Sequence, residues 1–160
     1  MPAIKMREFL DKNHIRYATV KHSPAYTAQA VAASAHVPVN EMVKTVMIEV
    51  DGKMAMAVLP ASNQIEFDEL KLALGTANIN LLREDDFKDR FPDCEPGAMP
   101  PFGNLYGMPV FVADSLAQDD YMAFSAGSHH EVVIMTYADY ARLVNPRVVK
   151  FSAEILALPS

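Results

Sequence analysis

The chain has 160 residues, of which 51% are hydrophobic and 21% are charged, and its formal net charge is −6. This length and apolar content suit one domain with a sizeable core, and they exclude a chain that is disordered throughout. The acidic balance excludes a broadly basic nucleic-acid clamp. We therefore expect residues 1–160 to form a single domain.

The cellular location is predicted from the hydropathy and the cysteine content. No run approaches the roughly 18 apolar residues that a membrane-spanning helix needs. The first 15 residues mix charges with apolar side chains, unlike a secretory signal. Cys94 is the single cysteine of the sequence, so no internal disulfide is possible, and this cysteine content suits a reducing compartment. We expect a cytoplasmic protein with no membrane partner.

Hydrophobic patterning in the first half of the chain predicts interspersed helices and strands. Thr27 is placed to cap an alanine-rich helix. Asp51-Gly52 between two apolar runs predicts a two-residue hairpin turn, because both residue types accept a positive φ. The expected elements are a helix at 4–13, a strand at 16–21, a helix at 27–34, a hairpin of strands 43–50 and 53–59, and a helix that Asp68 caps and Gly75 ends.

The second half of the chain contains a long loop, residues 92–109, with five prolines and three glycines. Such a loop in a compact domain is usually functional or mobile. The other expected elements are strands at 78–82, 110–113, 121–125 and 132–135, and helices at 84–90 and 137–143, the last capped by Thr136. Because the order lacks a regular βαβ rhythm, we predict an α+β domain with a mixed, mainly antiparallel sheet that is strongly curved or barrel-like.

Lys44 is an unusual residue for its place in the predicted hairpin. Strand alternation puts it on the same face as Val46, Ile48 and Val50. Two interpretations fit this position. The side chain lies at a frayed strand start and reaches water, or it is a cation at the mouth of a pocket that meets a phosphate or carboxylate. The neighbouring Thr45 is either an ordinary strand residue or a hydroxyl contact to the same ligand.

Two further segments have residue types that suit a ligand site. In Gly97-Ala98-Met99-Pro100-Pro101-Phe102-Gly103, glycine allows close backbone approach and the prolines stiffen the chain, so the N–H groups of the non-proline residues could polarise a carbonyl. In Gly127-Ser128-His129-His130, a turn could place a hydroxyl or an imidazole in a cleft. A structural turn and a surface histidine are the alternative interpretations. Zinc is disfavoured because no Cys-x-x-Cys or His-x-x-x-His spacing is present.

Together these features resemble the YbaK-type aminoacyl-tRNA deacylases, which are related to the editing domain of bacterial prolyl-tRNA synthetases. The matching stretches are HSPAYTAQAVA, VKTVMIEVDG, VLPAS, FPDCEPGAMPPFGNLYGMPVFVAD and AGSHHEVVIM…DYARL. They occur in the family order and cover roughly residues 20 to 151. The resemblance implies a mixed α/β fold with a curved sheet, and hydrolysis of the ester that joins a wrong amino acid to the 3′-terminal ribose of a tRNA.

The resemblance also implies roles for individual residues. Lys44, Gly97 and His129 correspond to the catalytic positions of the family, and Lys44 would hold the terminal phosphate or ribose. The expected substrate-binding residues are Tyr26, Thr45, Ala98, Met99, Pro100, Pro101, Gly127 and Ser128. Some members that edit alanyl-tRNA carry Asn directly after the lysine, whereas this chain has Thr45, a difference that argues against specificity for alanine.

The expected mechanism uses backbone N–H groups near Gly97 to stabilise the oxyanion. Water would be activated by a ribose hydroxyl of the substrate, with His129 mainly positioning, or by His129 itself. Neither a metal nor a cofactor is expected. The expected partners are the tRNA acceptor end and an aminoacyl-tRNA synthetase, and the alternative function is a non-catalytic module that binds the same ligands.

Overall fold

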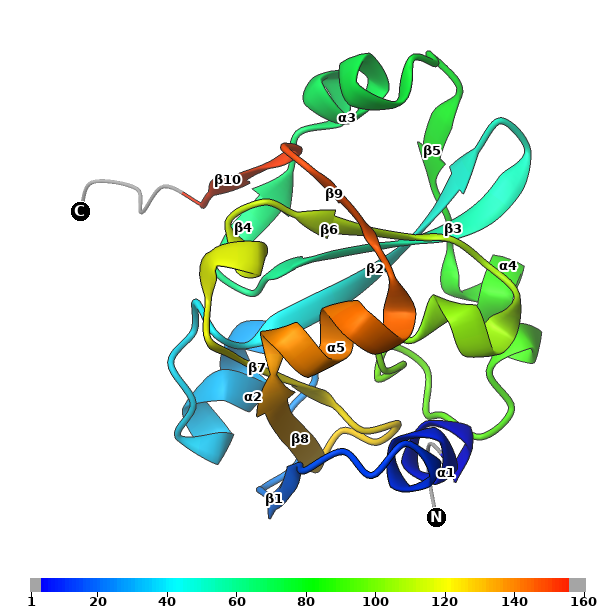
Figure 1. The fold of residues 1–160 in the computed structure, drawn as a ribbon. Helices are drawn as coiled ribbons and strands as arrows, with labels where there is room; N and C mark the ends of the chain where they lie inside the picture. Colours follow the sequence, from blue (N-terminus) through cyan, green and yellow to red (C-terminus); the bar gives the residue numbers. More distant parts are fainter. Residues whose placement is uncertain (1–3, 156–160) are drawn as a thin grey trace.

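The computed structural model describes residues 4–155, and in this part of the chain helices pack around three strand ladders (Figure 1). The ladders have the strand orders β5-β2-β3-β6-β9, β1-β8-β7 and β10-β4. The strands are β1 (Ala18–Lys21), β2 (Val43–Val50), β3 (Lys53–Pro60), β4 (Asn63–Ile65), β5 (Ile79–Leu81), β6 (Val110–Ala113), β7 (Tyr121–Ser125), β8 (Glu131–Thr136), β9 (Arg147–Val149) and β10 (Ser152–Glu154). The helices are α1 (Ile4–Lys12), α2 (Ala28–Ala35), α3 (Phe67–Leu74), α4 (Glu84–Phe87) and α5 (Tyr137–Val144), with 3₁₀ turns at Lys88–Arg90, Gly103–Tyr106 and Leu116–Gln118.

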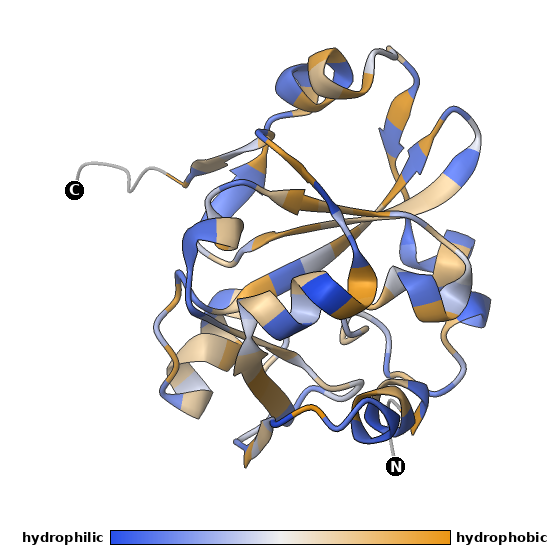
Figure 2. Cartoon of the chain, viewed as in Figure 1, coloured by the Kyte–Doolittle hydropathy of each residue, from blue (hydrophilic) through white to orange (hydrophobic). Residues whose placement is uncertain are grey.

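The predicted hairpin is confirmed as the antiparallel pair β2 and β3. Its register runs from Val43 opposite Pro60 to Val50 opposite Lys53. Asp51 and Gly52 form the turn with φ values of 50° and 82°, which is the conformation that an Asp-Gly turn requires. Alternate residues of β3 enter different apolar clusters, so both faces of this strand are covered and its sequence is almost continuously apolar. Figure 2 shows this apolar character along β3 and β6.

The prediction of a mixed, mainly antiparallel sheet is confirmed, whereas the predicted barrel-like closure is wrong. Of the seven strand pairings in residues 4–155, five are antiparallel, and β3–β6 and β6–β9 are parallel. The three-stranded ladder is joined to the five-stranded one through the isolated bridge Met42–Ala123. Beyond this bridge β2 and β7 separate, so the strands do not close into a barrel.

Two of the predicted helix caps are confirmed and one is wrong. Thr27 Oγ1 accepts from the Ala30 N–H at the start of α2, and Thr136 Oγ1 accepts from the Asp139 N–H at the start of α5. The predicted cap Asp68 lies inside the first turn of α3, because that helix begins at Phe67 and its N-cap position is Glu66. Gly75 ends α3 as predicted, with a φ of 68°.

No helix within residues 4–155 combines the length and the apolar character needed to cross a lipid bilayer.

Candidate active site

A cavity of about 260 Å³ lies where β2 separates from the three-stranded ladder. Lys44 and Thr45 line it from the start of β2, and Ser125 lines it from the end of β7. The parallel bridge between Met42 and Ala123 precedes Lys44 and Ser125 by two residues on each strand. The divergence of the two strands therefore makes room for a ligand at a point where their side chains face a shared space.

Six of the predicted site residues line this cavity. They are Tyr26, Lys44, Thr45, Gly97, Met99 and His129. They come from four segments that are distant in the sequence: the approach to α2, the start of β2, the loop 92–109 and the turn before β8. The fold thus brings the lysine, the glycine-proline segment and the histidine to one place.

The Lys44 ammonium is a partly buried cation without a counterion in the described part of the chain. No carboxylate of residues 4–155 lies within 4 Å of it, and its strand partner Leu59 is fully buried. Burial lowers the pKa of Lys44, because an apolar environment penalises the charged form. An uncompensated cation at a cavity wall is suited to bind a phosphate or a polarised oxygen of a ligand.

Residues 96–101, which we call the strap, contain two cavity-lining residues whose backbone N–H groups make no hydrogen bond within residues 4–155. The Ala98 N–H donates to Glu95 O (3.0 Å), so Ala98 is excluded as an oxyanion donor. Within residues 4–155 the N–H groups of Gly97 and Met99 have no acceptor, and both residues line the cavity. Gly97 has a φ of 82°, a conformation that disfavours any residue with a Cβ.

The strap and the turn at residues 126–130 are joined by hydrogen bonds. The Gly127 N–H donates to Ala98 O (2.9 Å), and Gly127 O accepts from the Glu95 N–H (2.7 Å). His129 Nε2 donates to Pro96 O (2.7 Å), which leaves Nδ1 as the unprotonated nitrogen of the neutral ring. The His129 ring lies against Tyr26, with 4.9 Å between centroids.

Five of the predicted substrate-binding residues do not line the cavity. They are Ala98, Pro100, Pro101, Gly127 and Ser128. Gly127 and Ala98 hold the strap to the turn, and Pro101 O accepts a hydrogen bond from the buried Tyr140 hydroxyl (2.6 Å). Ser128 is fully buried, and its hydroxyl has no partner in residues 4–155. Of these five residues, Ala98, Pro101 and Gly127 therefore take part in hydrogen bonds that hold the strap in place.

Replacing Tyr140 with Phe is expected to destabilise the protein, because Pro101 O would lose its buried donor. We expect the free energy of unfolding to fall by about 1–2 kcal/mol, measured by urea denaturation. Tyr121→Phe is the matched control, since Tyr121 is 53% exposed. Equal stabilities of the two variants would contradict the anchoring role of Tyr140.

Several cavity residues were not identified from the sequence. Thr27, Ala28, Gln29 and Val31 line the cavity from the first part of α2 and its cap, and Ser125, Val43 and Val46 line it from strands. The α2 residues fall in the HSPAYTAQAVA stretch, so a signal for them was present. Ser125 had none, because the separation of β7 from β2 depends on tertiary structure.

No cluster of three or more His, Cys, Asp or Glu side chains suited to a metal ion occurs within residues 4–155.

Comparison with known proteins places the chain among editing proteins. A family model described as an aminoacyl-tRNA editing domain matches residues 22–143. The multifunctional Ser/Thr-tRNA deacylase ProXp-y of Escherichia coli K12 is 28% identical over 141 residues, which are 84% of this chain and 83% of that protein. A proline–tRNA ligase of Staphylococcus aureus is 35% identical over 75 residues, which are 47% of this chain and 13% of the ligase.

Two solved structures share the fold. A protein described as a candidate trans-editing enzyme for prolyl-tRNA synthetase superimposes with a TM-score of 0.78 at 15% identity, over 94% of this chain and 96% of its own. The hypothetical protein APE2540 superimposes with a TM-score of 0.82 at 17% identity, over 93% and 99% of the two chains.

Proposed function

The chain belongs to the aminoacyl-tRNA editing domain family, and from this membership we propose that it acts in trans as an aminoacyl-tRNA deacylase on mischarged tRNA. The reaction is hydrolysis of the ester between the amino acid and the 3′-terminal ribose. The observation that carries the proposal is that Lys44, Gly97 and His129 line one cavity. The partner is the tRNA acceptor end, and the similarity to part of a proline–tRNA ligase supports a synthetase as a second partner.

In this proposal Lys44 binds the acceptor end by charge. The ammonium has no competing carboxylate within 4 Å in residues 4–155, so a phosphate or ribose oxygen would supply its missing partner. The net charge of −6 disfavours extensive contact with the RNA backbone. Recognition limited to the end of the acceptor strand agrees with both facts.

The free N–H groups of Gly97 and Met99 would stabilise the oxyanion that forms when water attacks the ester carbonyl. Such donors are effective because they are oriented before the reaction begins. The strap meets this requirement: Gly127 and Tyr140 hold it by hydrogen bonds on two sides.

A ribose hydroxyl of the substrate would activate the attacking water. His129 would position the water or the ribose for this step. His129 Nε2 is committed to Pro96 O, so the unprotonated Nδ1 is the nitrogen that can accept a hydrogen bond from the water or the ribose.

The proposed amino acid is serine or threonine. The E. coli relative is named for deacylation of Ser/Thr-tRNA. The hydroxyl-bearing side chains of Thr27, Thr45 and Ser125 line the cavity, and such groups can hydrogen-bond the substrate hydroxyl. An alanyl ester would leave that hydrogen bond unmade.

Thr45→Val keeps the side-chain shape and removes the hydroxyl. We expect kcat/KM for threonyl-tRNA to fall roughly fivefold, the worth of one hydrogen bond, and kcat/KM for alanyl-tRNA to stay unchanged. Initial deacylation rates with the two substrates measure this selectivity. Thr19→Val is the control, because Thr19 is exposed on β1. An equal loss of kcat/KM on both substrates would show that Thr45 does not recognise the side chain of the amino acid.

The proposed function is tested by incubating the pure protein with a panel of mischarged tRNAs and following ester loss. Turnover of seryl- or threonyl-tRNA supports the proposal. Saturable binding of the acceptor end without hydrolysis on any tRNA would overturn it in favour of the non-catalytic module.

A further inference from the structure

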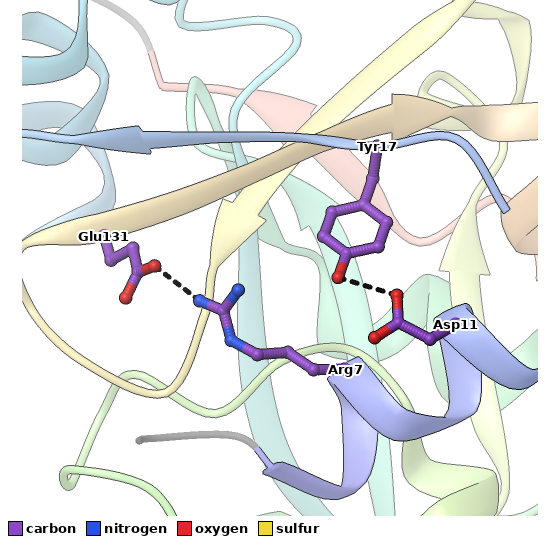
Figure 3. Close-up of polar contacts among 4 residues, drawn as sticks. All are labelled: Arg7, Asp11, Tyr17 and Glu131. Carbon is purple, nitrogen blue, oxygen red and sulfur yellow. Dashed lines mark hydrogen bonds and ion pairs between the residues drawn. The ribbon is translucent and has the colours of Figure 1, made fainter.

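The turn that carries His129 is connected to helix α1 by an ion pair that is largely shielded from solvent. Arg7 Nη2 lies 2.5 Å from Glu131 Oε1, and the two side chains are 16% and 8% exposed (Figure 3). Glu131 is the first residue of β8 and follows His129 by two positions. Its carbonyl accepts from the Ala126 N–H (3.0 Å), which closes the turn at residues 126–130. A displacement of Glu131 would therefore also displace the turn.

Arg7 supplies the positive charge that compensates the shielded carboxylate of Glu131. Within residues 4–155, Arg7 supplies the one ion pair and the one side-chain hydrogen bond of this carboxylate. A buried carboxylate that loses its counterion keeps its desolvation penalty, so the surrounding chain tends to rearrange until water reaches the charge. The segment that would move is the turn, because Glu131 forms its end.

Helix α1 also contacts the chain on the other side of the site. The Lys5 N–H donates to Asp93 Oδ2 (3.4 Å) in the loop that leads to the strap, and the Phe9 and Phe102 rings pack edge-on at 6.2 Å. Asp11 accepts from the Tyr17 hydroxyl (3.0 Å), close to the start of β1 (Figure 3). β1 in turn pairs with β8. Helix α1 thus contacts the chain on either side of the strap, at Asp93 and Phe102, and it contacts the turn through Arg7.

We propose that Arg7 is a positioning residue for deacylation. Its ion pair with Glu131 holds the turn, and the turn holds His129 and, through Gly127, the strap with its free N–H groups. Arg7 lies outside residues 22–143, which the family model matches, so family membership does not assign it this role. The inference rests on the proposed function and concerns the same cavity.

The test is a double-mutant cycle of Arg7→Gln and Glu131→Gln, with seryl- or threonyl-tRNA as substrate. Because Lys44 still binds the acceptor end, we expect Arg7→Gln to lower kcat by tenfold or more, with KM within about twofold. The double variant has no buried charge to compensate, so its kcat should return to within about threefold of the wild type. Arg7→Lys should restore part of kcat. Arg142→Gln is the control, since it breaks an exposed pair with Asp139.

The histidine ring signals in NMR spectra provide a readout that does not depend on activity. We expect the His129 signals to shift in Arg7→Gln and to return in the double variant. An unchanged His129 signal in Arg7→Gln, or a double variant as slow as the single one, would overturn the inference. If Arg7→Gln does not fold, the folded double variant decides: wild-type-like kcat and His129 signals support the role, and altered ones refute it. A wild type that hydrolyses no tRNA would refute the proposed function, while the NMR comparison still decides the role of Arg7.

Discussion

Lys44→Met is expected to abolish most deacylation while leaving the protein at least as stable as the wild type. The substitution keeps the apolar stem of the side chain and removes its positive charge. We assign to that charge the binding of the tRNA acceptor end. A charge-assisted contact contributes about 1.5–3 kcal/mol, so kcat/KM should fall roughly 10- to 100-fold. Deacylation of seryl- or threonyl-tRNA under single-turnover and steady-state conditions measures the loss.

The stability half of this prediction follows from the direction of the pKa shift. Burial lowers the pKa of Lys44 in the folded protein, so the charged form costs stability at neutral pH. This cost begins to fall as the pH rises through the lowered pKa, and it is gone above the pKa of lysine in the unfolded chain. Removing the ammonium should therefore leave the melting temperature unchanged or higher. Lys53→Met, at an exposed position of the same hairpin, is the control and should change neither property. A variant at Lys44 that is fully active would contradict the assigned role.

Gly97→Ala is expected to lower kcat by about 100-fold, because the strap must leave its conformation to accept a side chain. A non-glycine residue at a φ of 82° is strained by roughly 1–2 kcal/mol. A Cβ at this position would lie 3.5 Å from His129 Cε1, an ordinary contact, so the strain arises from the backbone. Relief of that strain rotates the Gly97 N–H, and loss of one oxyanion donor typically costs 100-fold or more in kcat. Steady-state kinetics on the preferred tRNA measures this loss.

Gly75→Ala separates the effect on catalysis from the effect on stability. Gly75 also has a positive φ, 68°, and it ends α3 away from the cavity. A Cβ added to Gly75 would meet no atom within 4 Å, so the backbone is again the source of strain. Both variants should lose a similar free energy of unfolding in urea denaturation. Only Gly97→Ala should lose kcat, and equal kcat values for the two variants would show that the strap backbone does not take part in the reaction.

Local sequence signals predicted the elements whose geometry is decided by neighbouring residues. Asp51-Gly52 predicted the hairpin because both residues tolerate the positive φ that its turn needs, and Thr27 and Thr136 predicted helix starts because each hydroxyl reaches an N–H three residues ahead. The three-residue strands β4, β9 and β10 were missed, whereas β5, which is equally short, was predicted at 78–82.

Features that depend on long-range packing were not predictable in the same way. The parallel pairings of β3, β6 and β9 join segments about 35–55 residues apart, and nothing local specifies them. The barrel prediction failed for the same reason, because a single bridge between Met42 and Ala123 determines where the sheets part. In the candidate site, the motifs indicated which segments meet. They did not indicate that Pro101 and Gly127 face away from the cavity and hold its wall.

The hydrogen bonds between the strap and the turn have a consequence for how sequence changes combine. The Gly127 N–H binds Ala98 in the strap, the Gly127 carbonyl binds Glu95 next to the strap, and His129 binds the strap again at Pro96. Damage to any one of these links loosens the same unit, so two substitutions, one in each segment, should cost less together than the sum of their separate costs. From epistasis of this kind we expect changes in one segment to be accompanied by changes in the other.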